Sequence, residues 1–269
     1  MSNEILTVDE LVDKPYCAYV VGEMGVGKTT FLRLLKAYEA WLQKRFGLEA
    51  VVFNTFEEEK PPCWDDYIHH KDAKIPHESI YQAQLWFARQ KINMIRAAMG
   101  LDLQNQVMAP DPRSLGIYFV DRTLHEDFYV FAQGLERLFP KGMYEQYIKE
   151  VEKYLLEIPP PDLVIRLQVE TPEISQARVL SRGWGEQLRL SRYHQMAEQY
   201  EDHIDPWIEE MGVPIVPIRT DYPHFDFKDP YGQNYFLTTL LTGLHNNGVW
   251  LPDYHRLPVE MLLYNGKNS

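Results

Sequence analysis

The sequence predicts an α/β fold: a doubly wound parallel sheet with helices on both faces. Short apolar runs alternate with helical patterns along the 269 residues, as expected for parallel strands joined by crossover helices. A glycine-rich phosphate-binding pattern lies between the first predicted strand and the first predicted helix, where such folds carry it. Because no repeat or long Gly/Ser linker divides the chain, we expect a single domain over residues 1–269.

Five buried strands are predicted from short apolar runs, at residues 16–21, 50–53, 116–120, 163–169 and 214–218.

Helices are predicted between these strands. Apolar residues recur at helical spacing between Phe31 and Leu42, along residues 80–98 and between Phe128 and Leu138. Two regions lack a clear period. Residues 57–79 are polar and rich in Pro, His and charge, so we expect an insertion loop there. We expect residues 244–269 to form a C-terminal extension.

Composition narrows the possible functions. The chain is 45% hydrophobic and 25% charged, as in ordinary soluble proteins, and its net charge of −12 argues against binding along a nucleic-acid backbone. No apolar run reaches the ~18–20 residues of a membrane span, and the first residues lack a signal-peptide layout. Cys17 and Cys63 are too few for a disulfide framework. We therefore expect a cytoplasmic enzyme or protein-binding module, with neither nucleic acid nor membrane as a partner.

Residues 22–29, GEMGVGKT, fit the P-loop pattern G-x-x-x-x-G-K-[ST]. The glycines let backbone N–H groups surround phosphate oxygens, and the following helix adds the partial positive charge of its N-terminus. Lys28 would reach the β- and γ-phosphates, while the Thr29 hydroxyl would bind Mg²⁺. The predicted ATP-binding residues of this segment are Gly22, Gly25, Gly27, Lys28, Thr29 and Thr30.

Charged residues follow the next two strands at the sheet edge where ligands bind. Asp121 could hold Mg²⁺ through water, and Arg122 could neutralise charge on the transferring phosphoryl group or hold the acceptor. The alternative for both is a structural ion pair at a strand end. Glu57, Glu58 and Glu59 follow the second strand. They form either a solvated turn or a site in which one carboxylate accepts the proton of the attacking hydroxyl.

Together these residues resemble the deoxyribonucleoside kinase family. Residues 121–132, DRTLHEDFYVFA, are similar to the family segment [DE]-R-[ST]-x-x-x-D-x-x-[IV]-F-A, and residues 81–89 resemble its helix with Gln and Arg seven residues apart. Residues 178–193 resemble its phosphate-binding lid. The resemblance spans about residues 15–228 and implies a P-loop nucleoside/nucleotide kinase fold with a helical lid, and a homodimer.

The resemblance implies roles around the phosphates. Glu59 would be the general base, since it lies five residues before Trp64 as in the family's E-P-x-x-x-W pattern. Lys60 replaces the Pro of that pattern, so Glu57 and Glu58 remain candidates. Arg122 would contact the 5′-oxygen and the phosphoryl group, and Asp121 the metal. Arg178 and Arg182 would clamp ATP phosphates, the alternative being a solvated basic stripe.

The resemblance also implies a nucleoside site. Gln82 would bind the base edge through its amide, with Arg89 and Asp127 paired beside it, as in members that accept deoxycytidine and purine deoxynucleosides. Without the motif, Gln82 would be a solvent-facing helix residue, and Arg89 and Asp127 a structural salt bridge. Glu186 would bind the 3′-hydroxyl. Tyr67 is the nearest candidate for a tyrosine that the family has eleven residues before its glutamine.

We therefore expect an ATP- and Mg²⁺-dependent kinase acting on the 5′-hydroxyl of a deoxynucleoside, with a purine or deoxycytidine favoured. The predicted lid is one residue shorter than usual, and Trp184 stands where the family often has an arginine. Because these departures lie near the phosphates, a deoxynucleoside monophosphate is the alternative acceptor. A non-catalytic nucleotide-binding relative is a further alternative, although the intact P-loop and Asp121-Arg122 pair argue against it.

Overall fold

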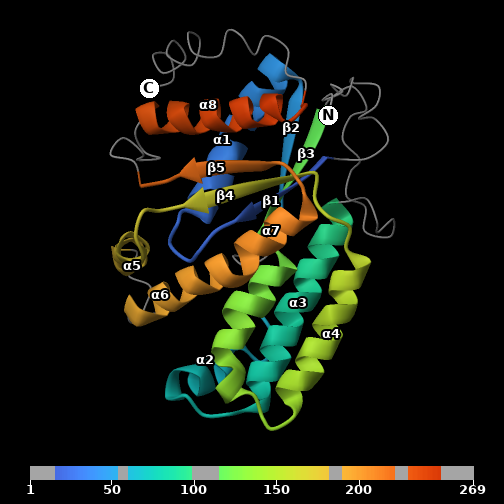
Figure 1. The fold of residues 1–269 in the computed structure, drawn as a ribbon, viewed down its shortest axis with the longest axis vertical. Coiled ribbons are helices and arrows are strands. Elements are labelled where there is room, and N and C mark those ends of the chain that lie inside the picture. The colour runs from blue at the N-terminus through green and yellow to red at the C-terminus, as the bar shows by residue number, and fades with distance from the viewer. Residues whose placement is uncertain (1–15, 54–59, 99–114, 182–189, 222–229, 250–269) are drawn as a thin grey trace.

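The computed structural model describes residues 16–53, 60–98, 115–181, 190–221 and 230–249 (Figure 1). In these ranges five strands form one sheet in the order β2-β3-β1-β4-β5, and every neighbouring pair is parallel. The predicted doubly wound parallel sheet is confirmed. The strands are β1 (Tyr16–Val21), β2 (Leu48–Phe53), β3 (Leu115–Asp121), β4 (Leu163–Gln168) and β5 (Ile215–Arg219).

Helices connect these strands and cover both faces of the sheet (Figure 1). The segment after β3 forms a π-helical stretch, η1 (Glu126–Ala132), followed by a 3₁₀ stretch, η2 (Gln133–Leu138); a second π-helical stretch is η3 (Tyr200–Ile204). The α-helices are α1 (Lys28–Phe46), α2 (Trp64–Ala73), α3 (Glu78–Ala98), α4 (Met143–Glu157), α5 (Pro172–Ser181), α6 (Leu190–Gln199), α7 (Asp205–Met211) and α8 (Pro230–Asn246).

The central strand β1 contributes to a different core on each face of the sheet. Tyr16, Ala18 and Val20 pack in a cluster with α1 and α8, whereas Tyr19 and Val21 pack in a cluster with α3, α6 and α7. This division follows from the alternation of side chains along a strand. Because both faces are covered, the strand is a continuous apolar run, which is the pattern that predicted it. A third cluster joins α2, α3, η1, η2 and α4 beyond the sheet.

The expectation of a loop over residues 57–79 is wrong for the part that the structure describes. Trp64–Ala73 forms α2, and α3 already begins at Glu78. The only buried residue of α2 is Tyr67, while Trp64 and Ile68 pack partly against the third cluster. Such a short helix with a narrow apolar stripe gives little periodic signal, and that is why composition suggested a loop.

The C-terminal region and the lid are described only in part. Helix α8 extends to Asn246, past the expected start of the extension at residue 244, and residues 250–269 lie outside the described part. The predicted lid, residues 178–193, comprises the end of α5, the undescribed residues 182–189 and the start of α6.

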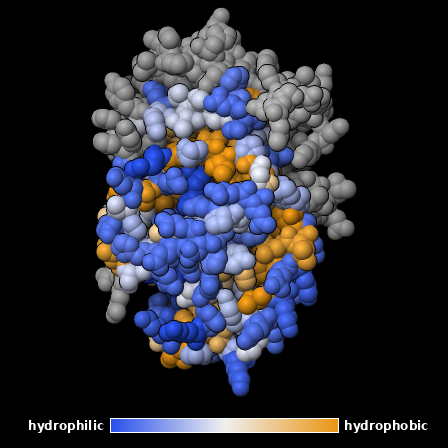
Figure 2. Space-filling model, viewed as in Figure 1, coloured by the Kyte–Doolittle hydropathy of each residue, from blue (hydrophilic) through white to orange (hydrophobic). Residues whose placement is uncertain are grey.

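The surface in Figure 2 is mainly hydrophilic on this face, with separate hydrophobic patches in the upper centre and along the right side. Of the helices that the structure describes, none combines the length and the apolar character needed to cross a bilayer.

Candidate active site

The P-loop and the Asp121–Thr123 segment lie side by side because β1 and β3 are neighbours. Val20 pairs with Asp121 in the sheet, so the two strands end at the same level. Strands β2 and β3 lie on one side of β1, whereas β4 and β5 lie on the other side. The strand order therefore reverses direction at β1, and such a position is a topological switch point. In open α/β sheets, ligands bind at such points, beyond the carboxyl ends of the strands.

The P-loop follows β1, and helix α5 packs closely against it. Gly25 has φ +90°, and a Cβ there would overlap the backbone carbonyl oxygen of Ser175 in α5. Gly27 has φ +104° in the left-handed region and caps α1. The turn therefore requires glycine at both positions, for space and backbone conformation at Gly25 and for backbone conformation at Gly27.

Lys28 is buried at the first residue of α1, and its Nζ donates hydrogen bonds to the carbonyl oxygens of Gly22 and Glu23. Burial, together with the nearby Arg122 cation, lowers the pKa of Lys28 to about 8. Anionic phosphates at this loop would favour the charged form. Lys28 therefore lies against the loop that the sequence pattern assigns to phosphate groups.

The residues predicted to hold Mg²⁺ are suited to it. Asp121 is 5% exposed, and among the described residues its Oδ1 has no hydrogen-bond partner. Thr29 lies in the first turn of α1, which follows the P-loop after the neighbouring strand β1. Carboxylate and hydroxyl oxygens are the ligands that Mg²⁺ prefers, together with water and substrate phosphates. An unpartnered buried carboxylate oxygen beside a P-loop fits such an ion.

Arg122 has an unusual backbone conformation, with φ +65°, and its N–H donates to the carbonyl oxygen of Val20 at 3.0 Å. Its guanidinium carbon lies 4.3 Å from the ring centroid of Phe131. Burial opposes its charge, but Asp121 and Asp127 outweigh this effect and raise the pKa of Arg122 above its ordinary value. Left-handed conformations in non-glycine residues cost energy and cluster at functional sites. Arg122 is therefore a fixed cation at the sheet edge.

Asp127 follows in η1 and is 4% exposed. Burial raises its pKa to about 6, against the opposing effect of the Lys91 and Arg122 cations. Its Oδ2 has no hydrogen-bond partner in the part of the chain described. A buried carboxylate with a free acceptor oxygen is suited to receive a hydrogen bond from a ligand.

The structure does not bring Gln82 and Arg89 to this cluster. Gln82 is exposed, and its Nε2 donates to Glu78 at 3.1 Å. Arg89 donates to the Tyr154 hydroxyl at 3.3 Å and lies 3.9 Å from a Glu150 oxygen, with 56% of its side chain exposed. Gln82 and Arg89 line a separate groove of about 490 Å³, whose other residues come from α2, α3 and the chain before α2. The predicted Arg89–Asp127 pair is therefore not formed.

Two other residues of α3, Gln84 and Lys91, are buried instead. Gln84 is 4% exposed, and its Nε2 donates to the Tyr67 hydroxyl at 3.4 Å. Lys91 is fully buried, and its Nζ donates to the backbone carbonyl oxygen of Asp121. Burial lowers the pKa of Lys91, an effect that the nearby Asp127 carboxylate opposes.

The sequence contains a signal for this pair that motif matching missed. Gln84 and Lys91 are also seven residues apart, and each lies four residues from an apolar residue, Ile80 and Ile95 respectively. Both isoleucines are buried, so the helical period places Gln84 and Lys91 on the buried face of α3. Tyr67, predicted as a substrate contact, lies at 7% exposure next to Gln84.

Arg178 packs against the outer side of the P-loop. It donates to the Thr220 hydroxyl at 2.9 Å and to the Val26 carbonyl oxygen at 3.5 Å. The Thr220 hydroxyl in turn donates to the same Val26 oxygen at 2.7 Å. Arg178 thus connects α5 to the P-loop and to the end of β5. Its predicted partner Arg182, together with Glu59 and Glu186, lies outside the described residues.

Sequence reasoning also missed two buried groups near the P-loop. Arg166 in β4 donates to both carboxylate oxygens of Asp205, at 2.8 and 3.2 Å, and its guanidinium carbon lies 4.5 Å from the Tyr200 ring centroid. Glu126 in η1 accepts hydrogen bonds from Gly22 and Tyr200. The sequence carried a cue for Glu126, since Thr123-Leu-His-Glu126 is a capping-box pattern.

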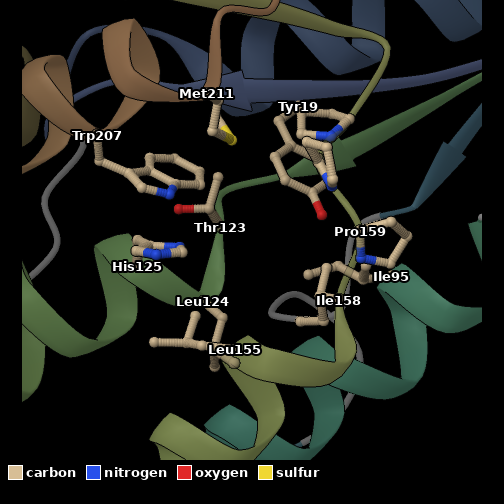
Figure 3. Close-up of a pocket in the computed structure, with 12 residues that line it drawn as sticks. Tyr19, Ile95, Thr123, Leu124, His125, Leu155, Ile158, Pro159, Trp207 and Met211 are labelled. Atoms are coloured by element: carbon tan, nitrogen blue, oxygen red, sulfur yellow. The ribbon is translucent and has the colours of Figure 1, made fainter.

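A cavity of about 260 Å³ lies beside the Asp121–Thr123 segment. Figure 3 shows His125 and Trp207 face to face near Thr123, with Tyr19 across the cavity; the ring centroids of His125 and Trp207 are 3.8 Å apart. Burial lowers the pKa of His125 to about 4, so its imidazole is neutral at pH 7. Apolar and aromatic side chains dominate the lining, and no lysine or arginine is among the lining residues. Among the described residues, this lining therefore offers no fixed cation for a phosphate group.

The fold and the site together define a P-loop kinase: a parallel sheet whose P-loop lysine lies beside a fixed arginine and two buried carboxylates, each with one oxygen that has no hydrogen-bond partner among the described residues. The family model for deoxynucleoside kinases matches residues 19–234. The chain belongs to the deoxynucleoside kinase family and is an ATP-dependent deoxynucleoside kinase.

Solved structures support the fold assignment. Deoxyadenosine kinase from M. mycoides with the products dCMP and a flexible dCDP has a TM-score of 0.56 at 18% identity, covering 86% of this chain and 99% of that one. The same enzyme with dCTP has a TM-score of 0.54 at 19% identity, covering 84% and 98%. With dATP the TM-score is 0.54 at 21% identity, covering 84% and 99%. The comparison with curated proteins gives no match.

Proposed function

We propose that this kinase transfers the γ-phosphoryl group of ATP to the 5′-hydroxyl of a deoxynucleoside, preferring deoxyadenosine, deoxyguanosine or deoxycytidine to thymidine. One observation carries the proposal: the buried Lys91, Asp121 and Asp127 form a charged cluster with the half-buried Arg122 beside Lys28 of the P-loop. The cluster places cations for a phosphoryl group beside a carboxylate suited to a nucleobase.

In this proposal the phosphoryl end of the site works by charge neutralisation and alignment. Lys28 and the P-loop N–H groups hold the phosphates of ATP, and Arg122 faces the group in transfer. Thr29 and Asp121 hold Mg²⁺, which supplies further neutralisation of phosphate charge when bound. A fixed cation such as Arg122 contributes because it needs no rearrangement as charge develops in the transition state.

We assign base recognition to Gln84, Lys91 and Asp127 rather than to Gln82 and Arg89. A side-chain amide both donates and accepts, so Gln84 can pair with a base edge while the Tyr67 hydroxyl orients it. Asp127 offers an unpartnered acceptor that suits the amino group of adenine or cytosine. Thymine, unlike adenine, guanine and cytosine, carries no amino group, and an ionised carboxylate would repel its carbonyl oxygens. The deoxyadenosine kinase structures with bound dCMP, dCTP and dATP are consistent with this preference.

Three residues outside the described part keep the roles that the family resemblance gives them. We propose Glu59 as the general base for the 5′-hydroxyl, with Glu57 and Glu58 as alternatives, Arg182 as a phosphate ligand and Glu186 as the partner of the 3′-hydroxyl. We also propose a homodimer, which light scattering of the purified protein would test.

The decisive experiment measures ATP consumption against eight acceptors, the four common deoxynucleosides and their monophosphates, with products identified by mass. Monophosphate products from a purine deoxynucleoside or deoxycytidine are expected. Diphosphate products would show that the acceptor is a deoxynucleoside monophosphate and that the enzyme is a nucleotide kinase. If no acceptor stimulates turnover, the chain is a non-catalytic relative.

A further inference from the structure

Glu126 joins three separate segments of the chain through one buried carboxylate. It is 0% exposed; its Oε2 accepts from the Thr123 N–H at 2.7 Å, and its Oε1 accepts from the Gly22 N–H at 3.2 Å and from the Tyr200 hydroxyl. The Glu126 N–H itself donates to the Thr123 hydroxyl oxygen at 3.0 Å. Both carboxylate oxygens are therefore in use.

We propose that Glu126 is a positioning residue that sets the P-loop and Arg122 in register for phosphoryl transfer and connects both to η3. This inference rests on the proposed kinase activity. Gly22 is the first residue of the P-loop, and Thr123 directly follows Arg122. A carboxylate that holds both N–H groups therefore constrains the distance between the ATP phosphates and the cation that faces them.

Capping of a helix end explains only half of these contacts. The exchange between Thr123 and Glu126 is a capping box, which satisfies donors at the start of the helical segment that leads into η1. The two bonds to Oε1, however, come from residues 104 and 74 positions away along the chain. A local cap needs neither of them, so the second oxygen serves the tertiary arrangement.

A carboxylate is the side chain that this junction requires. An ionised carboxylate only accepts hydrogen bonds, and three donors converge on its two oxygens here. Such charge-assisted bonds are stronger than neutral ones. In Glu126→Gln, one oxygen becomes an NH₂ group, which must face at least one of these donors. The variant keeps the size of the side chain but cannot satisfy the junction.

Tyr200 extends the connection towards the predicted lid. It follows α6, which contains the last residues of the predicted lid, and its ring packs under the Arg166 guanidinium. Arg166 in turn binds Asp205 of α7. A shift of η3 would therefore move the Glu126 carboxylate and, through its hydrogen bonds, the P-loop and the backbone next to Arg122.

The test compares Glu126→Gln with Glu136→Gln, an exposed glutamate in η2, in the full-length enzyme. Misplacement of reacting groups by about 1 Å can cost on the order of 10²-fold. We expect Glu126→Gln to lower kcat at least about 10-fold and to raise the KM for ATP. The KM for the deoxynucleoside should stay within about 3-fold, because Glu126 bonds to Gly22, Thr123 and Tyr200 rather than to the side chains assigned to the base. Glu136→Gln should match the wild type.

Tyr200→Phe provides a second, milder variant, since it removes one donor and leaves the capping box and the Gly22 contact in place. In Glu126→Gln/Tyr200→Phe, the two losses should overlap rather than multiply, because the residues share one interaction. Fully independent effects would overturn the connection to η3. Wild-type kcat and ATP KM in a folded Glu126→Gln protein would overturn the whole inference.

ATP affinity without acceptor, measured by equilibrium dialysis, separates this inference from the proposed function. If wild-type protein binds ATP but no deoxynucleoside stimulates turnover, the proposed function fails. Weaker ATP binding by Glu126→Gln would still support its role at the P-loop, and unchanged binding would contradict it.

Discussion

At the residue scale, we expect opposite effects on substrate binding from substitutions in the two pairs of α3, Gln84 with Lys91 and Gln82 with Arg89. Lys91 lies beside Asp127 in the buried cluster, whereas Arg89 faces the outer groove. We expect Lys91→Gln to lower kcat/KM for the preferred deoxynucleoside by about 10-fold or more, since Asp127 loses its opposing charge. Arg89→Gln is the matched control and should have little effect. The reverse result would restore the pairing that the motif predicted.

Substitutions of the P-loop lysine and of the proposed general base test phosphate binding and proton removal separately. Lys28→Ala should abolish turnover without unfolding the protein, because the cation that meets the phosphates is lost; circular dichroism and ATP turnover together check this expectation. Normal activity in the folded variant would contradict the P-loop assignment.

For Glu59→Gln we expect kcat to fall by about 10²-fold or more while ATP binding is retained, since only proton removal is affected. Single-turnover rates and equilibrium dialysis measure the two quantities. Glu58→Gln is the comparison, and a larger loss there would move the base to Glu58.

His125 predicts a pH dependence of stability. Its pKa is about 4 in the folded protein and about 6.5 when unfolded, so the unfolded state binds a proton that the folded state does not. The resulting stability is present above about pH 6.5 and is lost as pH falls towards 4, by up to about 3 kcal/mol. His125→Phe, which retains a ring to stack on Trp207, should lose less stability between pH 7 and 4.5 in urea unfolding.

Asp127 acts in the opposite direction over an overlapping range. Its pKa, raised to about 6, contributes stability at low pH that is lost as pH rises from about 4 to 6. The difference between His125→Phe and the wild type is therefore the informative quantity, because Asp127 affects both proteins equally. An unchanged pH profile in the variant would exclude His125 as a source of acid sensitivity.

At the scale of elements, the close approach of α5 to the P-loop predicts a strong effect of one methyl group. Gly25 and Gly47 both have positive φ, but a Cβ on Gly25 would overlap the Ser175 backbone, whereas a Cβ on Gly47 would meet nothing within 4 Å. Gly47→Ala should cost only about 1 kcal/mol of unfolding free energy. Gly25→Ala should cost more and also weaken ATP binding, measured by dialysis, because α5 or the loop must move. Equal effects would contradict the packing of α5 on the loop.

Elements also show where prediction from the sequence succeeds. The strand β1 and the helix α1 were predicted because each carries a strong local pattern, a continuous apolar run or a helical period. The short α2 was missed because its contact with the core is mainly through Tyr67. The segment between Phe128 and Leu138 was predicted as helical, but the spacing of its apolar residues did not indicate the π and 3₁₀ geometry that the structure shows.

At the scale of the whole molecule, the charge is unevenly placed. The chain has a net charge of −12, yet Lys28, Lys91, Arg122 and Arg166 meet at one edge of the sheet. An acidic exterior disfavours long polyanions, while converging cations at the sheet edge favour a small phosphorylated ligand.

The sequence by itself determined the phosphate chemistry, because a P-loop is a contiguous segment whose backbone N–H groups and lysine bind phosphate together. Which residues share the buried cluster was decided only by the tertiary structure. Helix α3 contains two pairs in which a glutamine precedes a basic residue by seven positions. Only Gln84 and Lys91 are buried, because their side of the helix packs against the core. Likewise, Glu126 reads as a local cap in sequence, and only the meeting of β1, η1 and η3 makes it a junction. Local patterns specify contiguous motifs, whereas contacts between distant segments depend on how the helices pack on the sheet.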